Sequence, residues 1–310
     1  MEIIRAAAIL VCIPVLALGA AKAHDFRANA KAPPHIDDLV DEHDYDETVK
    51  AAPDDGTRWL LSRALLWKPG STLSACFLDG SQNSRALVIN DAQYLVANPA
   101  HPVNLKISFA NGAATDCNKV GGTFKEDIRV TFDNGCCSSY VGRVSHNTAV
   151  AAGGNVFLQE GLDDVTIKHE LMHALGFQHE HQKPASPCDF NYPVIAQAYG
   201  WSLAEVQNNF NKLNNSSHAL AGSLGFDGAS IMKYYFDPSF LKSGTNSPCY
   251  TPQATDLSPT DWDGLKTAYP PGFDAAKFKA AATTAMSTRD VAAGMPTALK
   301  DAFKSSVSDY

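Results

Sequence analysis

The chain of 310 residues contains one short stretch dense in metal-binding side chains, HELMHALGFQHEH at 169–181. On an α-helix, residues i and i+4 share a face, so His169 and His173 can direct ring nitrogens at one ion. Glu170 lies beside that face, where its carboxylate can reach a water molecule bound to the ion. Histidines that hold a metal, and a carboxylate that takes a proton from its water, are the parts of a zinc hydrolase.

A third ligand is needed, because a catalytic zinc ion takes three protein ligands and keeps one position open. Neither His179 nor His181 would align with the first two histidines if the helix continued. Gly176 tolerates a positive φ, so the chain can turn there and bring His179 back to the ion. We therefore expect His179 to complete a site for one catalytic Zn²⁺ ion. His181 is expected at the surface or behind the ligands.

The elements that must position these residues can be read from the surrounding sequence. Residues 163–176 have a helical period, with an aspartate to cap the start and Gly176 to end the helix. The other expected elements are strands at 71–78, 105–109, 127–132 and 153–159, and helices at 89–98, 192–199, 203–213 and 257–270.

Met232 follows the third histidine by about fifty residues, in SIMKYYF at 230–236. A lone methionine is usually a core residue. The pattern His-Glu-x-x-His-x-x-Gly-x-x-His, however, is the metzincin signature, which is accompanied by a methionine turn. We therefore expect Met232 to form a turn beneath the metal.

Among metzincins, the chain resembles the astacin family of secreted zinc endopeptidases over roughly residues 64–270. Glu180 directly follows the third histidine, and Tyr234 follows the methionine by two residues, as in that family. CSSYVGR at 137–143 and LSPTDWDGLKTAY at 257–269 resemble two further family segments.

The resemblance implies an α+β fold of the metzincin type. A twisted mixed β-sheet with long helices would form the N-terminal subdomain, and an active-site cleft would separate it from a less regular C-terminal subdomain. It also implies that Tyr234 is a fifth zinc ligand that leaves the metal and donates a hydrogen bond to the oxyanion. Glu180 would anchor the mature N-terminus or support the site through a salt bridge; the alternative is a solvated carboxylate.

The chain departs from the family in its cysteines and in its N-terminal segment. The family's partner for Cys137, shortly before the zinc helix, has no counterpart, and neither does the last cysteine after the final helix. Residues 24–62 also lack the Phe-x-Gly-Asp pattern by which many family pro-segments block the zinc. The disulfide pairing of the family therefore cannot be transferred.

These observations predict a secreted zinc-dependent endopeptidase that hydrolyses peptide bonds of proteins through a zinc-bound water activated by Glu170. A protein or peptide substrate would lie extended along an exposed strand, for which 153–159 is the candidate. One alternative is a zinc-holding but non-proteolytic binding protein on the same fold, against which Glu170 argues. Another metzincin-type hydrolase is the second alternative, against which Glu180 and Tyr234 argue.

Four segments are expected along the chain. Residues 1–23 resemble a secretory signal peptide, with Arg5, an apolar stretch and an Ala-Lys-Ala cleavage site. An acidic pro-segment or linker at 24–62 and the catalytic domain at 63–272 follow. An alanine-rich helical or disordered tail occupies 273–310. Since no later stretch is long and apolar enough to span a bilayer, we expect an extracellular protein without a membrane anchor.

Composition excludes one class of partner and indicates disulfides. With 33 acidic against 25 basic residues and no basic run, the chain offers no footprint for nucleic acid. Six cysteines remain after the predicted signal, which in an exported protein indicates up to three disulfides. The neighbours Cys136 and Cys137 are expected to bond to different partners.

Overall fold

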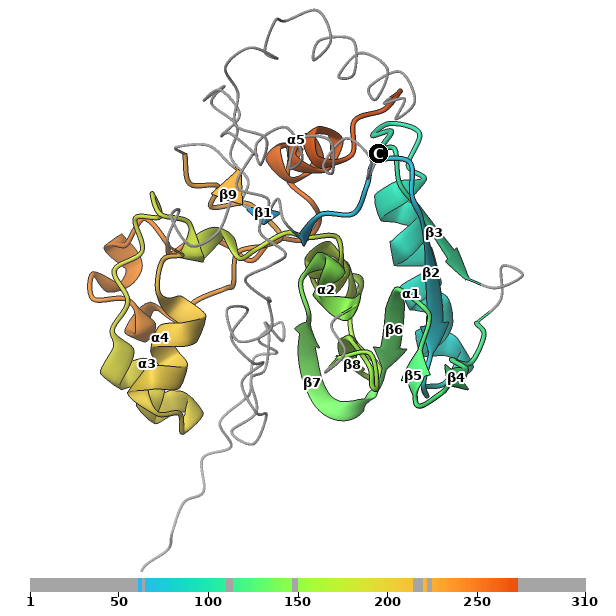
Figure 1. Ribbon diagram of the computed structural model, residues 1–310. Coiled ribbons are helices and arrows are strands. Elements are labelled where there is room, and N and C mark those ends of the chain that lie inside the picture. Colours follow the sequence, from blue (N-terminus) through green and yellow to red (C-terminus); the bar gives the residue numbers. More distant parts are fainter. Residues whose placement is uncertain are drawn as a thin grey trace, which may run out of the picture.

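The computed structural model describes residues 61–62, 65–109, 114–146, 150–213, 220–221 and 225–272 (Figure 1). The predicted signal peptide, nearly all of the predicted acidic segment and the predicted tail lie outside these residues. The last two residues of the acidic segment form β1 (Leu61–Ser62), which pairs antiparallel with β9 (Leu220–Ala221).

A five-stranded mixed sheet in the order β3-β2-β6-β8-β7 forms the frame of the N-terminal part (Figure 1). Four strands are parallel, and β7 at one edge is antiparallel to β8. The strands are β2 (Thr72–Phe77), β3 (Lys106–Phe109), β6 (Ile128–Thr131), β7 (Asp133–Ser139) and β8 (Val156–Gln159), and β4 (Lys119–Val120) and β5 (Thr123–Phe124) form a small hairpin.

The sequence predicts residues 153–159 as an exposed edge strand, and this prediction is wrong. β8 pairs with β6 on one side and with β7 on the other, so it is an inner strand. The strand that covers it, β7, contains Asn134-Gly135, a pair typical of turns. Because of this pair, the sequence pattern does not predict β7 as a strand.

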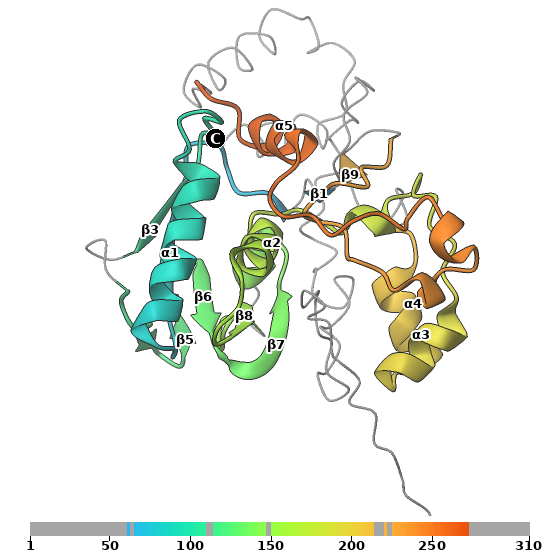
Figure 2. The same cartoon turned by 180° about the vertical axis from the view of Figure 1, so that it is seen from behind.

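Two helices pack against the sheet and against each other (Figures 1 and 2). α1 (Gln82–Val96) begins well before the predicted start at 89, because the Ser81 side chain caps it by accepting a hydrogen bond from the Ser84 N–H. α2 (Asp164–Ala174) lies where it is predicted, and the Asp163 side chain accepts from the Thr166 N–H at 2.8 Å.

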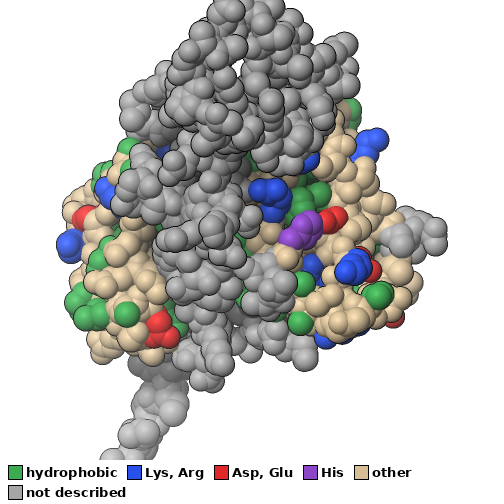
Figure 3. Space-filling view, in the orientation of Figure 1, with side chains coloured by type: hydrophobic (Ala, Val, Ile, Leu, Met, Phe, Trp, Pro, Cys, Tyr) green, Lys and Arg blue, Asp and Glu red, His purple; other side chains and the backbone are tan. Residues whose placement is uncertain are grey.

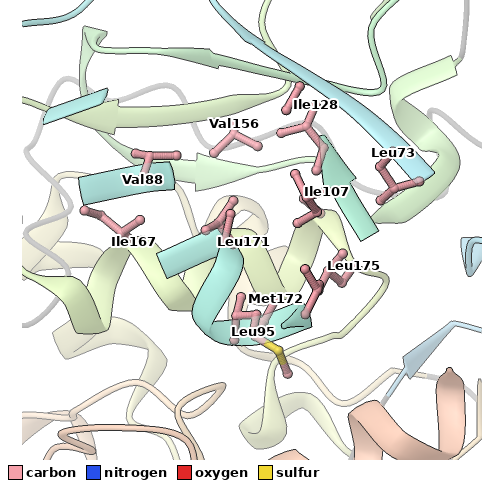
Figure 4. Packing of buried hydrophobic residues seen from close by; sticks show 14 of the residues in the cluster. Leu73, Val88, Leu95, Ile107, Ile128, Val156, Ile167, Leu171, Met172 and Leu175 are labelled. Carbon is pink, nitrogen blue, oxygen red and sulfur yellow. The ribbon is translucent and has the colours of Figure 1, made fainter. Parts of the chain in front are cut away.

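The main hydrophobic core lies between these helices and the sheet. Val88 and Leu95 of α1 meet Ile167 and Leu171 of α2 there, against Ile128 of β6 (Figure 4). Because this apolar face of α2 is directed at the core, the polar residues of the same helix are left on its other side. The packing of α2 thus determines where its histidines point.

The C-terminal part is less regular, as predicted. α3 (Tyr192–Tyr199) and α4 (Leu203–Phe210) pack on each other (Figure 1). Both helices contribute to a second buried cluster, which is rich in aromatic rings. Short 3-10 helices in the described residues of this part are Glu180–Gln182, Pro238–Phe240 and Gly244–Asn246, and another, Gly142–His146, precedes α2. α5 (Pro259–Ala268) returns to the N-terminal core through Trp262 and Leu265.

Two disulfides lie within the described part of the chain, Cys76–Cys117 and Cys188–Cys249. The first ties β2 to the segment after β3, and the second ties the segment before α3 to that before α5. None of the helices in the described ranges is long and apolar enough to cross a membrane. Acidic and basic side chains are scattered over the described part of the face in Figure 3.

Candidate metal centre

The α2 helix brings His169 and His173 to one face, opposite the apolar residues that face the core. His179 joins them from the segment after the helix, and one ligand atom of each of the three rings lies within 4.8 Å of the others. Ring centroids of His173 and His179 are 4.5 Å apart, and those of His169 and His173 are 4.8 Å apart. The three histidines predicted as ligands therefore converge.

Gly176 makes this convergence possible. Its φ is 97°, in the left-handed region that favours glycine, and a Cβ atom there would lie 2.7 Å from the Leu66 side chain. The Gly176 N–H donates to His173 O, and the Phe177 N–H donates to Met172 O, so the helix closes before the chain turns. Both the turn and the close approach of Leu66 require glycine.

The donor set fits a divalent metal ion. Each Nδ1 atom donates to an oxygen: His169 to Ile231 O at 2.7 Å, His173 to Phe177 O at 2.7 Å and His179 to Gln182 Oε1 at 3.0 Å. Neutral rings that carry the proton on Nδ1 have a lone pair on Nε2. His173 Nε2 and His179 Nε2 are only 2.9 Å apart, so their two lone pairs repel each other. A cation bound to both atoms would remove this repulsion.

Burial keeps these rings neutral. It lowers the pKa of His169 to about 4 and lowers the pKa of both His173 and His179 well below the usual value. Repulsion between the neighbouring rings acts in the same direction. Because only the neutral imidazole binds a metal, protons compete weakly with an ion at this site near neutral pH.

The methionine turn supports two of the histidines through its backbone. Ile231 O accepts from His169 Nδ1, and Met232 O accepts from the Glu180 N–H at 2.9 Å, next to His179. The Met232 side chain is buried in the main core. The turn thus connects His169 on α2 with the segment that carries His179.

Tyr234 lies against the histidines, and its neighbour does not. The Tyr234 ring is buried, with its centroid 4.3 Å from that of His179 and 5.8 Å from that of His169. Tyr235 is 40% exposed and its ring faces Tyr250.

Glu170 is buried on α2, directly after His169. An open pocket borders this region, lined by Val165, Thr166, His169, Ile231, Lys233, Tyr234, Tyr235, Gln253 and Ala254.

Comparison with known proteins places this centre in a family. The sequence model of Astacin, described as a peptidase family, matches residues 111–266, half of the chain. The chain belongs to the astacin family. This is a zinc-dependent peptidase family, and the resemblance to astacins seen in the sequence is confirmed.

Individual relatives match shorter segments. The zinc metalloproteinase nas-12 of Caenorhabditis elegans is 33% identical over 98 residues, which are 32% of this chain and 22% of that protein. The zinc metalloproteinase nas-14 of the same organism is 49% identical over 47 residues, 15% of this chain and 8% of that protein. The matched segments therefore span less than a quarter of either relative.

A solved structure extends the comparison to the whole fold. The structure of myroilysin matches 69% of this chain and 100% of its own, with a TM-score of 0.56 and 24% sequence identity. The predicted α+β fold of the metzincin type is thus confirmed.

Glu180, which marks the astacin resemblance, is buried, so the solvated alternative is wrong. Its Oε1 atom lies 3.2 Å from Lys183 Nζ and accepts from the Asp227 N–H at 2.9 Å. Burial raises the pKa of Glu180 to about 7, although Lys183 opposes this shift. The sequence-based reasoning missed Lys183, whose position three residues after Glu180 was the available signal.

His181 does not lie at the surface. It is completely buried, and its ring lies 5.0 Å from His179 and 4.7 Å from Tyr234 between centroids. Its Nε2 atom donates to Asn209 O at 3.0 Å, which directs the ring into the aromatic cluster of the C-terminal part. His181 thus packs behind His179.

Two further residues hold the C-terminal end of α2 and were missed from the sequence. Trp67 Nε1 donates to Ala174 O at 2.8 Å, and the Tyr269 hydroxyl donates to Leu175 O at 2.6 Å. Carbonyl groups in the last turn of a helix have no partner within the helix, so these bonds stabilise the turn at Gly176. The only indication of this role in the sequence is that Tyr269 lies at the end of the family-like segment 257–269.

Proposed function

We propose that this chain is a zinc-dependent endopeptidase in which one catalytic zinc ion is bound by the Nε2 atoms of His169, His173 and His179. The observation that supports it best is the convergence of three neutral imidazoles, two of them buried and that of His179 half-buried, whose Nδ1 atoms all donate to oxygen atoms. Membership of a peptidase family gives the reaction class, hydrolysis of peptide bonds in a protein or peptide substrate.

The protein supplies a base and a hydrogen-bond donor for this reaction. A bound zinc ion would lower the pKa of water and polarise a carbonyl oxygen. Glu170 is placed one residue after His169, and we assign it the proton transfer from the attacking water to the leaving amine nitrogen. The hydroxyl of Tyr234, whose ring lies beside that of His179, would donate a hydrogen bond to the oxygen that gains charge in the transition state.

The substrate would extend the central sheet. Of the described strands, none pairs with the outer edge of β7, and β7 contacts the α2 helix that holds the metal ligands. An extended peptide that pairs with β7 would therefore run past the histidines, a case of β-strand addition. This assignment replaces 153–159 with β7 as the docking strand.

Export and a removable N-terminal segment belong to the same proposal. Two disulfides fit an oxidising compartment, which agrees with the predicted signal peptide at 1–23. We further infer that residues 24–62 form a pro-segment of the catalytic domain at 63–272. A chain that begins near residue 62 would then be more active than the 24–310 form, and equal activity would refute this role.

Glu170→Gln tests the catalytic proposal. We expect the variant to bind zinc as the wild type does and to lose about 10²- to 10⁴-fold in cleavage of a protein substrate, because the amide cannot take the proton. Glu126→Gln, a matched change in the loop before β6, should cleave at the wild-type rate. A chelator should abolish wild-type cleavage and added zinc restore it. Unaltered cleavage by Glu170→Gln, or indifference to the chelator, would overturn the proposal.

A further inference from the structure

A buried carboxylate on α5 reaches the turn that supports the metal centre. Asp261, in the first turn of α5, is 2% exposed. Its Oδ1 atom accepts from the Ser230 hydroxyl at 2.6 Å, and its Oδ2 atom accepts from the Ile231 N–H at 2.8 Å and the Ser258 N–H at 2.9 Å. Helix capping uses only the last of these bonds, so it does not explain why the carboxylate reaches the methionine turn.

The remaining bonds form a continuous chain to a metal ligand. His169 Nδ1 donates to Ile231 O at 2.7 Å. The N–H of the same peptide group, on Met232, donates to Ser230 Oγ at 3.0 Å. The Ser230 hydroxyl then donates to Asp261 Oδ1. Three hydrogen bonds and one peptide group therefore connect the imidazole to the carboxylate.

The donor and acceptor groups allow only one direction for this series of hydrogen bonds. A carbonyl oxygen can only accept, so His169 must donate. The serine hydroxyl has one proton, which it gives to the carboxylate, and its lone pair receives the Met232 N–H. Every donor therefore lies on the histidine side and the negative charge lies at the far end. His169, Ser230 and Asp261 are all buried, where such bonds polarise one another.

We propose that Asp261 is a positioning residue for His169, acting through Ser230 and the peptide between Ile231 and Met232; the proposal rests on the zinc site proposed above. Carboxylates or carbonyls that accept from a metal-binding histidine hold its ring in place and increase its basicity. Here the carboxylate acts at a distance, by increasing the acceptor strength of Ile231 O. It also gives Ser230 and Asp261, which lie in two separate family-like segments, a shared role.

The other two ligands have a different environment. His173 donates to Phe177 O, within its own turn. His179 donates to Gln182, whose amide donates in turn to Asn208 O at 3.2 Å. Among the described contacts, the chains from these two rings reach no carboxylate. Loss of Asp261 should therefore weaken the metal site through His169.

The test measures zinc affinity in the full-length protein by competition with a chromophoric chelator, together with the visible spectrum of the cobalt-substituted protein. We expect Asp261→Asn and Ser230→Ala each to lower zinc affinity about tenfold and to shift the cobalt bands. Both changes interrupt the same series of hydrogen bonds. The zinc affinity of the double variant should therefore be no lower than that of the weaker-binding single variant. Leu265→Ala, in the core face of the same helix, should lower the melting temperature but leave zinc affinity within about twofold.

Wild-type zinc affinity and cobalt bands in Asp261→Asn would overturn the proposal. Losses that multiply in the double variant, or an equal loss in Leu265→Ala, would also overturn it. If Asp261→Asn does not fold, Ser230→Ala decides, since it removes only the hydroxyl link. Peptidase activity is measured separately: an inactive wild type with the expected zinc affinities would refute the proposed function and support this inference.

Discussion

Glu180 and Lys183 form an ion pair with 3.2 Å between Oε1 and Nζ, and their side chains are only 1% and 2% exposed. The pair lies directly after His179, and the Glu180 backbone N–H is bonded to the methionine turn. A buried carboxylate without a cation is strongly unfavourable. Lys183 therefore allows Glu180 to be buried beside the third histidine.

Lys183→Met should lower the free energy of unfolding by up to about 3–5 kcal/mol at pH values above the pKa of Glu180, because it leaves the ionised carboxylate buried with no cation beside it. The double variant Glu180→Gln/Lys183→Met should recover most of this loss. Urea unfolding of the zinc-free protein measures both. Lys266→Met, at a lysine that is partly exposed on α5, should change the value by less than about 0.5 kcal/mol. Equal effects of the two single changes would contradict the importance of the buried pair.

Asp91 should make stability depend on pH. It is 6% exposed on α1, and its Oδ2 atom has no hydrogen-bond partner among the described residues. Burial first, and then repulsion by Asp164, raise its pKa to about 7, although Lys168 opposes this. The unfolded value is about 3.9, so between these values the folded state holds a proton that the unfolded state releases. Stability therefore falls as pH rises from about 4 to 7.

Asp91→Asn removes this titration. We expect the variant to be more stable than the wild type by roughly 1–3 kcal/mol at pH 8 and close to it at pH 4. Urea unfolding at the two pH values measures the difference. Asp263→Asn, at a carboxylate exposed on α5, is the control and should show no such dependence. A constant difference at both pH values would show that Asp91 does not titrate in this range.

The zinc helix can be predicted from sequence because its rules are local. Helical spacing aligns His169 with His173, Asp163 caps the helix, and only glycine suits the turn at Gly176. Each of these requirements involves residues that lie close together in the chain, so the positions of the three histidines follow without knowledge of the rest of the fold.

Other features depend on contacts between distant segments. His181 is buried because Phe190, Phe210 and Phe236 surround it, and its own sequence context resembles that of an exposed residue. β8 is an inner strand because β7 folds back over it. The bond from Tyr269 to Leu175 likewise joins the end of the domain to the zinc helix. Spacing in the sequence carries no information on such pairings.

Tyr234→Phe should lower kcat by about 10²- to 10³-fold, as loss of one oxyanion donor does in other hydrolases, with little change in KM. The ring would remain packed against His179, so zinc content should be unchanged. Steady-state kinetics on a peptide substrate and metal analysis measure the two quantities. Tyr235→Phe, which alters an exposed neighbour, should retain wild-type kcat. A variant with unchanged kcat would show that the hydroxyl takes no part in the reaction.

Zinc removal should destabilise the folded protein, because the bound ion would remove the repulsion between the Nε2 lone pairs of His173 and His179. At a free zinc concentration of about 100 times the Kd, binding contributes about 2.7 kcal/mol. The melting temperature should therefore fall on addition of a chelator and recover with zinc. His179→Ala should abolish this response, and His146→Ala should retain it, since His146 bonds to Asp127 away from the three ligands. A zinc response that survives in His179→Ala would place the bound ion elsewhere.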